Sequence, residues 1–396
     1  MKGMMMHRPL RIADILTFGE EAHGDAEIIS VTVEGGIHRT TYEETAGRVR
    51  KMANALQNIG VKLGDRIATL AWNGYRHFEL YYAISGIGAV CHTINPRLSA
   101  EQMVYIINHA EDSVICVDLT FVPILESLKD QIPAEMKFII MTDQDHMPDT
   151  SLKHVLCYEE LLEPCDSNIE WPEFPEETAS SLCYTSGTTG NPKGSLYTHR
   201  STVLHSLTAG ISFPETMRAG VRILPVVPLF HVNAWGLAYV APLVGASIIF
   251  PGPHLDGKSI FDLMDNENVF SAWGVPTVWL GLLGEITNRG RIPKGFGEVI
   301  IGGSAVPRSM VESFEKLEVS VCHAWGMTEM SPIGTNGRLS PVHARLPMSE
   351  KIDLKVKQGR RVYGVELKIV DESGNRVPHD GVSNGELYVR GNMIIS

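Results

Sequence analysis

Short apolar stretches alternate with amphipathic ones between residues 66 and 142. The apolar stretches with the length of strands are 66–71, 88–94, 113–118 and 137–142. Between them, apolar residues recur at helical spacing in 77–85, 99–110 and 122–130. Strands that alternate with helices form a parallel sheet covered by helices on both faces. The chain is therefore predicted to have an α/β fold.

The C-terminal half continues with buried strands, and the N-terminal region begins with a hairpin. The strands predicted there are 223–229, 246–250, 269–273, 298–301, 319–323, 364–370 and 385–389, and the hairpin pairs 27–32 with 39–41. Thr41 and Glu44 have the spacing of a capping box and predict a helix start. Pro225 and Pro228 predict that strand 223–229 ends at a turn that lines a site. Residues 331–360 are predicted to be a loop.

Composition excludes several classes of protein. Hydrophobic residues are 44% of the 396 and the net charge is −12, so a large core is expected and general nucleic-acid binding is not. The six cysteines are scattered without a C-x-x-C pair, which argues against a zinc site or a disulfide frame. Neither a signal peptide nor an apolar run of ~20 residues is apparent, so a cytoplasmic protein is expected.

The stretch Tyr184–Gly194 combines three glycines, four aliphatic hydroxyl residues, a proline and Lys193. Glycine lets the backbone approach a ligand closely, and hydroxyls, backbone N–H groups and a lysine suit phosphate oxygens. A flexible linker is the alternative, although a linker does not require Pro-Lys-Gly after the glycines. The spacing is not that of a Walker loop, because Gly187 is followed after four residues by Pro192. We interpret the stretch as a phosphate-binding loop of another kind.

Three further segments place candidate ligand-binding residues next to predicted strand ends. They are Phe230–Gly236, Gly302–Ala305 and Ala324–Glu329. Ligands of parallel sheets bind at the carboxyl ends of strands, and Gly302–Gly303 leaves room there for a planar ligand. Taken alone, the first and third segments are equally compatible with a packing role, and a capped turn is the simpler interpretation of the third.

Together these stretches resemble the adenylate-forming acyl-CoA synthetases. Tyr184–Gly194 resembles their phosphate loop and Trp325–Glu329 their aromatic-Gly-x-Thr-Glu motif. Cys91–Arg97, Pro228–Gly236 and His323–Met327 resemble in particular bacterial fatty-acyl-CoA ligases and 3-methylmercaptopropionate-CoA ligases. The resemblance implies two α/β subdomains, about 1–180 and 181–335, and a smaller distorted β-barrel from 336–396. Trp325 replaces the usual tyrosine, which removes a phenol hydrogen bond but keeps a stacking face.

The resemblance also implies the reaction and its participants: ATP, Mg²⁺, a carboxylic acid and CoA. Thr185, Lys193 and Glu329 are the implied catalytic residues, and Thr185 and Glu329 are the implied magnesium ligands. The residues implied to bind ATP or AMP are Thr185, Ser186, Gly187, Thr188, Thr189, Gly190, Lys193, Gly302, Gly303, Ser304, His323, Ala324, Trp325, Gly326, Met327 and Thr328. The residues implied to bind the acid are His231, Val232, Trp235 and Gly303.

Members of this family continue into a mobile C-terminal lid domain, so the 396 residues are expected to be a truncated form with poor activity. A homodimer is expected. The bulk of Trp235 and Trp273 favours a short or medium acid, because filled space excludes long chains. Two other functions stay open: an acyl-AMP ligase that loads a carrier protein, and a non-catalytic nucleotide-binding or dimerisation module.

Overall fold

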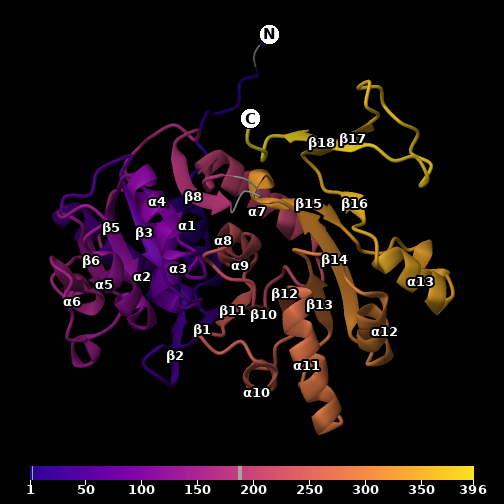
Figure 1. Cartoon of the computed structure of the whole chain (residues 1–396), viewed down its shortest axis with the longest axis horizontal. Helices are drawn as coiled ribbons and strands as arrows, with labels where there is room; N and C mark the ends of the chain where they lie inside the picture. Colours follow the sequence, from indigo (N-terminus) through magenta and orange to yellow (C-terminus); the bar gives the residue numbers. More distant parts are fainter. Residues whose placement is uncertain (2, 186–189) are drawn as a thin grey trace.

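The chain folds around two large mixed sheets, which a computed structural model describes for residues 1, 3–185 and 190–396 (Figure 1). The predicted Ser186, Gly187, Thr188 and Thr189 lie outside the described residues. No described helix has the length and apolar character needed to cross a membrane. All six cysteine thiols are buried and free.

The first sheet contains the strands of the alternating region. Its order is β7 (Val155–Cys157), β6 (Lys137–Ile140), β5 (Asp112–Val117), β3 (Arg66–Leu70), β4 (Val90–Thr93), β8 (Ala179–Thr185) and β9 (Lys193–Thr198). Neighbouring strands run parallel as predicted, except that β9 pairs antiparallel with β8 at the edge. The helices of this part are α2 (Tyr42–Asn58), α3 (Tyr75–Gly86), α4 (Ala100–Ala110), α5 (Val122–Leu128) and α6 (Tyr158–Leu162).

Local sequence signals explain where two of these helices begin. Thr41 and Glu44 form the predicted capping box of α2, in which each side chain bonds the other's backbone N–H. Ser99 and Gln102 make the same arrangement at α4. These reciprocal bonds satisfy backbone donors that have no partner within the helix, so they fix the first turn.

The second sheet gathers strands from distant parts of the chain. Its order is β16 (Arg360–Arg361), β15 (Ile333–Asn336), β14 (Ser320–Gly326), β13 (Glu298–Ile301), β12 (Ser271–Gly274), β10 (Arg222–Pro225), β11 (Ser247–Phe250), β1 (Glu27–Val31) and β2 (Ile37–Thr41). The strands from β14 to β1 are parallel, and β2, β15 and β16 are antiparallel at the two edges.

Among the described residues, eight helices belong to the part of the chain that carries the second sheet, and a two-stranded hairpin comes after them in the sequence. The helices are α1 (Ile12–His23), α7 (His199–Ser212), α8 (Val232–Trp235), α9 (Leu237–Val244), α10 (Gly257–Asn266), α11 (Pro276–Arg289), α12 (Arg308–Lys316) and α13 (Met348–Lys355). The short 3-10 helices are Leu119–Phe121, Gln144–His146, Thr328–Met330 and His343–Arg345. β17 (Val365–Val370) and β18 (Glu386–Gly391) pair antiparallel near the C-terminus.

Helix α3 lies between the two sheets and joins them. All of its residues are buried, which is the pattern of a helix that has no solvent face. Its Phe78 ring lies 6.0 Å from Phe250 of β11, and its Tyr82 hydroxyl donates to the Ala238 carbonyl of α9. The two sheets therefore share one hydrophobic core.

Several sequence predictions for 179–361 were wrong in detail. β9 was not predicted, and residues 331–360 contain β15 and α13 instead of a continuous loop. The strand predicted at 223–229 ends at Pro225, and the strand predicted at 319–323 extends to Gly326 because β15 pairs with its end. Segments that are distant in the chain share a sheet: β8 and β9 belong to the first sheet, and β1 and β2 belong to the second.

Candidate active site

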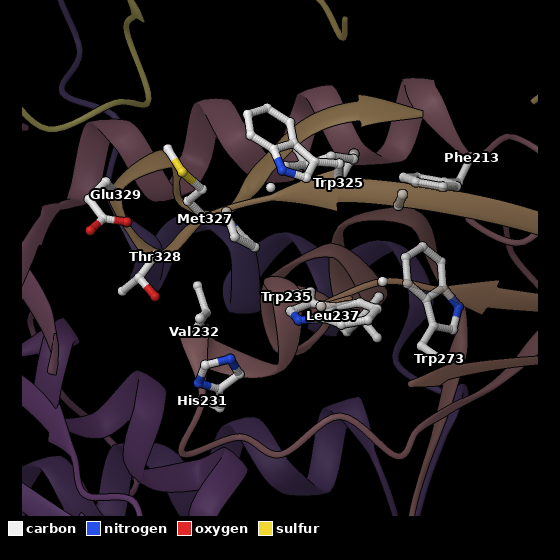
Figure 2. A pocket seen from close by; sticks show the side chains of 17 residues that line it. Phe213, His231, Val232, Trp235, Leu237, Trp273, Trp325, Met327, Thr328 and Glu329 are labelled. Carbon is white, nitrogen blue, oxygen red and sulfur yellow. The ribbon is translucent and has the colours of Figure 1, made fainter. Parts of the chain in front are cut away.

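A pocket of about 290 Å³ opens at the carboxyl ends of β12, β13 and β14 (Figure 2). The residues that line it are Ala209, Phe213, His231, Val232, Trp235, Leu237, Trp273, Gly302, Gly303, Ala324, Trp325, Gly326, Met327, Thr328, Glu329, Pro332 and Ile333. Figure 2 shows Thr328 and Glu329 at one end and Phe213 and Trp273 at the other. The pocket therefore has a polar end and an aromatic end, at the position where parallel sheets bind ligands.

Trp325 and Glu329 reach the pocket because a strand continues beyond its parallel partner. β14 passes β13 and pairs with β15 up to Gly326, and a 3-10 helix then carries Thr328 and Glu329. At Gly326 a Cβ atom would stand 1.9 Å from the Pro332 carbonyl oxygen, so only glycine fits. The Tyr197 hydroxyl of β9 donates to the Thr328 carbonyl, which ties this segment to the first sheet. The half-buried Trp325 indole packs against Gly334.

Trp235 enters the pocket from the segment between β10 and α9. Residues 232–235 have φ values between 48° and 56°, so this short helix is left-handed. The indole lies against the backbone of Gly302, where a Cβ atom would stand 3.0 Å from the ring. Gly302 therefore has the Trp235 ring on one side. That a planar ligand lies against Gly302–Gly303 stays a prediction.

The glycine-rich stretch joins the ends of β8 and β9. Thr185 is the last residue of β8 and Lys193 the first of β9, and the Thr185 hydroxyl lies 3.4 Å from the Lys193 carbonyl oxygen. Lys193 is exposed, as is Gly190 with φ 85°. Because β8 and β9 pair antiparallel up to Thr185 and Lys193, the stretch connects two neighbouring strands. Gly190 and Asn191-Pro192, at its described end, are residue types that turns favour.

The structure brings most of the predicted residues together. Those that line the pocket are His231, Val232, Trp235, Gly302, Gly303, Ala324, Trp325, Gly326, Met327, Thr328 and Glu329. Of the predicted site residues that the structure describes, five do not line the pocket: Thr185, Gly190, Lys193, Ser304 and His323. The His323 ring is buried with Nδ1 3.0 Å from the Val356 carbonyl oxygen, and burial lowers its pKa.

Five lining residues were not predicted from the sequence. They are Ala209, Phe213, Leu237, Pro332 and Ile333. Phe213 follows α7 and packs edge-to-face on Trp273, with 4.8 Å between ring centroids. An aromatic residue just after an apolar helix is a common packing pattern, so no local signal marked Phe213 as part of a site.

Two buried thiols lie near this region and are not reactive groups. Burial raises the pKa of Cys183 to about 11, and it raises the pKa of Cys91 as well. Both thiols therefore stay protonated at neutral pH and act as small hydrophobic side chains.

The fold and the pocket define an α/β protein with a cavity where parallel strands end. Residues 19–396 match the model of the family described as AMP-binding enzyme, and the chain belongs to that family. This confirms the family predicted from the sequence and its enzymatic class.

Named relatives agree with the family assignment. The chain is 47% identical over 396 residues to a 3-methylmercaptopropionyl-CoA ligase of Ruegeria lacuscaerulensis, covering 100% of this chain and 74% of the relative. It is 48% identical over 398 residues to a medium-chain-fatty-acid–CoA ligase of Ectopseudomonas oleovorans, covering 100% of this chain and 72% of the relative. A solved long-chain-fatty-acid-CoA ligase of Archaeoglobus fulgidus has a TM-score of 0.84 at 20% identity, covering 98% of this chain and 76% of that chain. This likeness confirms the predicted fold.

Proposed function

We propose that the protein activates a short- to medium-chain carboxylic acid with ATP and transfers the acyl group to CoA. A fatty acid and 3-methylmercaptopropionate are the candidate acids, because relatives that are 48% and 47% identical are named for them. The observation that supports this most is the two-ended pocket, with Glu329 at one end and an aromatic cluster at the other. Activation of an apolar acid requires both a charged and an apolar surface around one reacting carboxylate.

The aromatic end supports a small acid. Trp235, Phe213 and Trp273 surround it, and the Phe213 and Trp273 rings are in contact. A volume of about 290 Å³ is at the lower end of ligand pockets, which measure roughly 300–1,000 Å³. A long acyl chain would have to displace packed indoles, and such overpacking costs ~1–3 kcal/mol.

The polar end supports the adenylation step. The acid's carboxylate oxygen attacks the α-phosphorus of ATP, and the bond to the bridging oxygen breaks as pyrophosphate leaves. Two anions must meet, so the site has to orient both and offset their charge. Thr328 lies at this end for the α-phosphate, and the Trp325 indole offers a stacking face for adenine.

Glu329, at the polar end, supplies a carboxylate, which is a donor type that magnesium binds. Mg²⁺ prefers oxygen ligands and takes one or two from the protein, the rest from phosphates and water. We assign Glu329 Oε and Thr185 Oγ1 to it, and the ion would offset phosphate charge. Lys193 is exposed at the start of β9, where its ammonium can hold the phosphates that leave. The remaining predicted nucleotide contacts, including Ser304 and His323, stay predictions.

An assay of the products that the complete gene product forms, with and without CoA, distinguishes the three candidate functions. With ATP, Mg²⁺ and octanoate or 3-methylmercaptopropionate, the proposal expects AMP and acyl-CoA to form only when CoA is present. An acyl-AMP ligase would form acyl adenylate without consuming CoA, and a binding module would give neither product. The subdomain boundaries and the homodimer stay predictions, and sedimentation of the purified protein tests the dimer.

A further inference from the structure

The segment that carries Trp235 is a turn of left-handed helix made mostly of residues that disfavour it. The φ angles are 49° at Val232, 54° at Asn233, 48° at Ala234 and 56° at Trp235, and Gly236 follows at 79°. L-residues rarely adopt this region, and a β-branched residue such as Val232 is an outlier there. A strained backbone persists only where its surroundings determine it. Something in the structure must therefore hold this turn.

The Asn233 side chain makes the contacts that hold it. It is buried, and its Nδ2 donates to the Ser181 hydroxyl of β8 over 3.1 Å. Its Oδ1 lies 3.1 Å from the Tyr81 hydroxyl of α3 and 3.5 Å from the Cys183 thiol of β8. One amide thus connects the turn to the central helix and to the strand that leads into the glycine-rich stretch.

The end of the turn is held from the other side by close packing. A Cβ atom at Gly236 would stand 2.5 Å from Cε1 of His205, so glycine is required there. The His205 ring is buried, and its Nε2 accepts a hydrogen bond from the Ile333 backbone N–H of β15. The turn is therefore held at Asn233 and at Gly236, and the Val232 and Trp235 side chains on either side of Asn233 line the pocket.

We propose that Asn233 is a positioning residue for the acid site: its amide holds the left-handed turn on β8, and so keeps the Trp235 indole against Gly302 as a wall that limits acid length. Asn233 touches neither reacting group and acts through Trp235. The proposal rests on the function proposed above, in which the aromatic end of the pocket takes the acid. A competing explanation is that asparagine is present only because it tolerates positive φ.

Two substitutions separate these explanations. Asn233→Gly keeps a residue that tolerates positive φ but removes the amide, whereas Ser181→Ala leaves the turn's sequence intact and removes only the acceptor. Tyr42→Phe is the matched control, because it deletes a buried hydrogen bond, from the Tyr42 hydroxyl to the Ala246 carbonyl, at residues that do not line the pocket. Each variant is made in the complete protein.

The first measurement is kcat/KM for octanoate and propionate in ATP–pyrophosphate exchange. Loss of the clamp frees the indole, so the octanoate-to-propionate ratio should rise about tenfold in Asn233→Gly, the effect of a buried hydrogen bond. Ser181→Ala should move the octanoate-to-propionate ratio in the same direction. KM for ATP should stay unchanged in all variants, and the ratio in Tyr42→Phe should equal that of the unsubstituted protein. Octanoate-to-propionate ratios in Asn233→Gly and Ser181→Ala that equal the ratio of Tyr42→Phe would overturn the proposal. If Asn233→Gly does not fold, the ratio of Ser181→Ala alone tests the proposal.

The second measurement does not need catalysis. Protein labelled with 5-fluorotryptophan is compared by fluorine NMR, and Trp235→Phe assigns the resonance of residue 235. The proposal expects the resonance of residue 235 to be single and sharp in the unsubstituted protein. In Asn233→Gly the same resonance should be broadened or split. An unchanged resonance would overturn the clamp even if the protein catalyses no exchange, whereas absent exchange with a changed resonance would count only against the proposed function.

Discussion

The indole of Trp235 rests on the Cα atom of Gly302. A Cβ atom built at Gly302 would lie 3.0 Å from Cη2 of the indole and 3.0 Å from the Ala324 carbonyl oxygen. The contact joins the left-handed turn after β10 to the end of β13, so it connects the aromatic end of the pocket with the backbone at Gly302.

Gly302→Ala should lower activity by shifting the indole. The added methyl group has a fixed carbonyl on one side and the ring on the other, and such overpacking costs ~1–3 kcal/mol. We expect kcat/KM for octanoate to fall about tenfold. Gly284→Ala is the control, because a Cβ atom there meets nothing within 4 Å on helix α11. Full activity of Gly302→Ala with every acid tested would show that the contact does not shape the site.

Trp235→Ala should shift preference toward longer acids. Removal of the indole opens the aromatic end, and the new space can be filled by additional methylene groups, each worth about 0.8 kcal/mol when buried. The measurement is kcat/KM across acids of increasing length in the complete protein. Ile211→Ala, at an exposed position of α7, is the control and should leave the profile unchanged. A Trp235→Ala profile that matches this control would contradict the assignment of the acid end.

Glu329→Gln should abolish magnesium-dependent adenylation and leave the fold intact. The amide keeps the size of the side chain but not its charge, so the expected loss in rate is about a hundredfold or more, as for other groups that stabilise charge in a transition state. Pyrophosphate exchange at several Mg²⁺ concentrations measures it. Glu366→Gln, an exposed carboxylate paired with Arg390 in the β17–β18 hairpin, is the matched control. Retained exchange in Glu329→Gln would remove the metal role.

Stability should fall below neutral pH, and His199 should contribute to that loss. Its Nδ1 accepts a bond from the Ile12 backbone N–H, and burial, with a smaller effect of Arg11, lowers its pKa to about 3. The unfolded chain therefore binds a proton below its ordinary pKa of 6.5 that the folded chain does not bind until about 3. The stability this histidine contributes is present above 6.5 and lost as pH falls toward 3.

His199→Asn tests this, because the Asn Oδ1 stands near the position of Nδ1 and cannot titrate. The difference in unfolding free energy between the two proteins, measured in urea between about pH 5 and 7, should change by up to ~1.4 kcal/mol per pH unit. A difference that does not vary with pH would show that His199 is not held neutral in the folded protein.

Local sequence signals predicted much of the fold because the chemistry that defines them is local. The capping residues Thr41 and Ser99 begin their helices at the expected places, and the strands between 66 and 142 pair in parallel. The motif residues Trp325–Glu329 and Trp235 meet in one pocket, as their positions at strand ends suggested.

Other features could not be predicted, because they depend on partners far along the chain. Ile28 of β1 pairs with Ile248 of β11, and nothing near Ile28 marks this pairing. The left-handed turn at Asn233 is similar, since the Asn233 side chain bonds Ser181, which lies 52 residues earlier. A spacing pattern reports the periodicity of residues along one element. It therefore cannot predict a left-handed turn whose side chain bonds another element.

Acid-dependent exchange of pyrophosphate into ATP tests the central claim most directly, because it requires reversible formation of an acyl adenylate and nothing else. With the complete gene product and Mg²⁺, we predict exchange that depends on added octanoate, 3-methylmercaptopropionate or an acid of similar size, and that is lost in Glu329→Gln. Absence of exchange with every acid from propionate to palmitate, in a protein that is folded and binds ATP, would contradict the account.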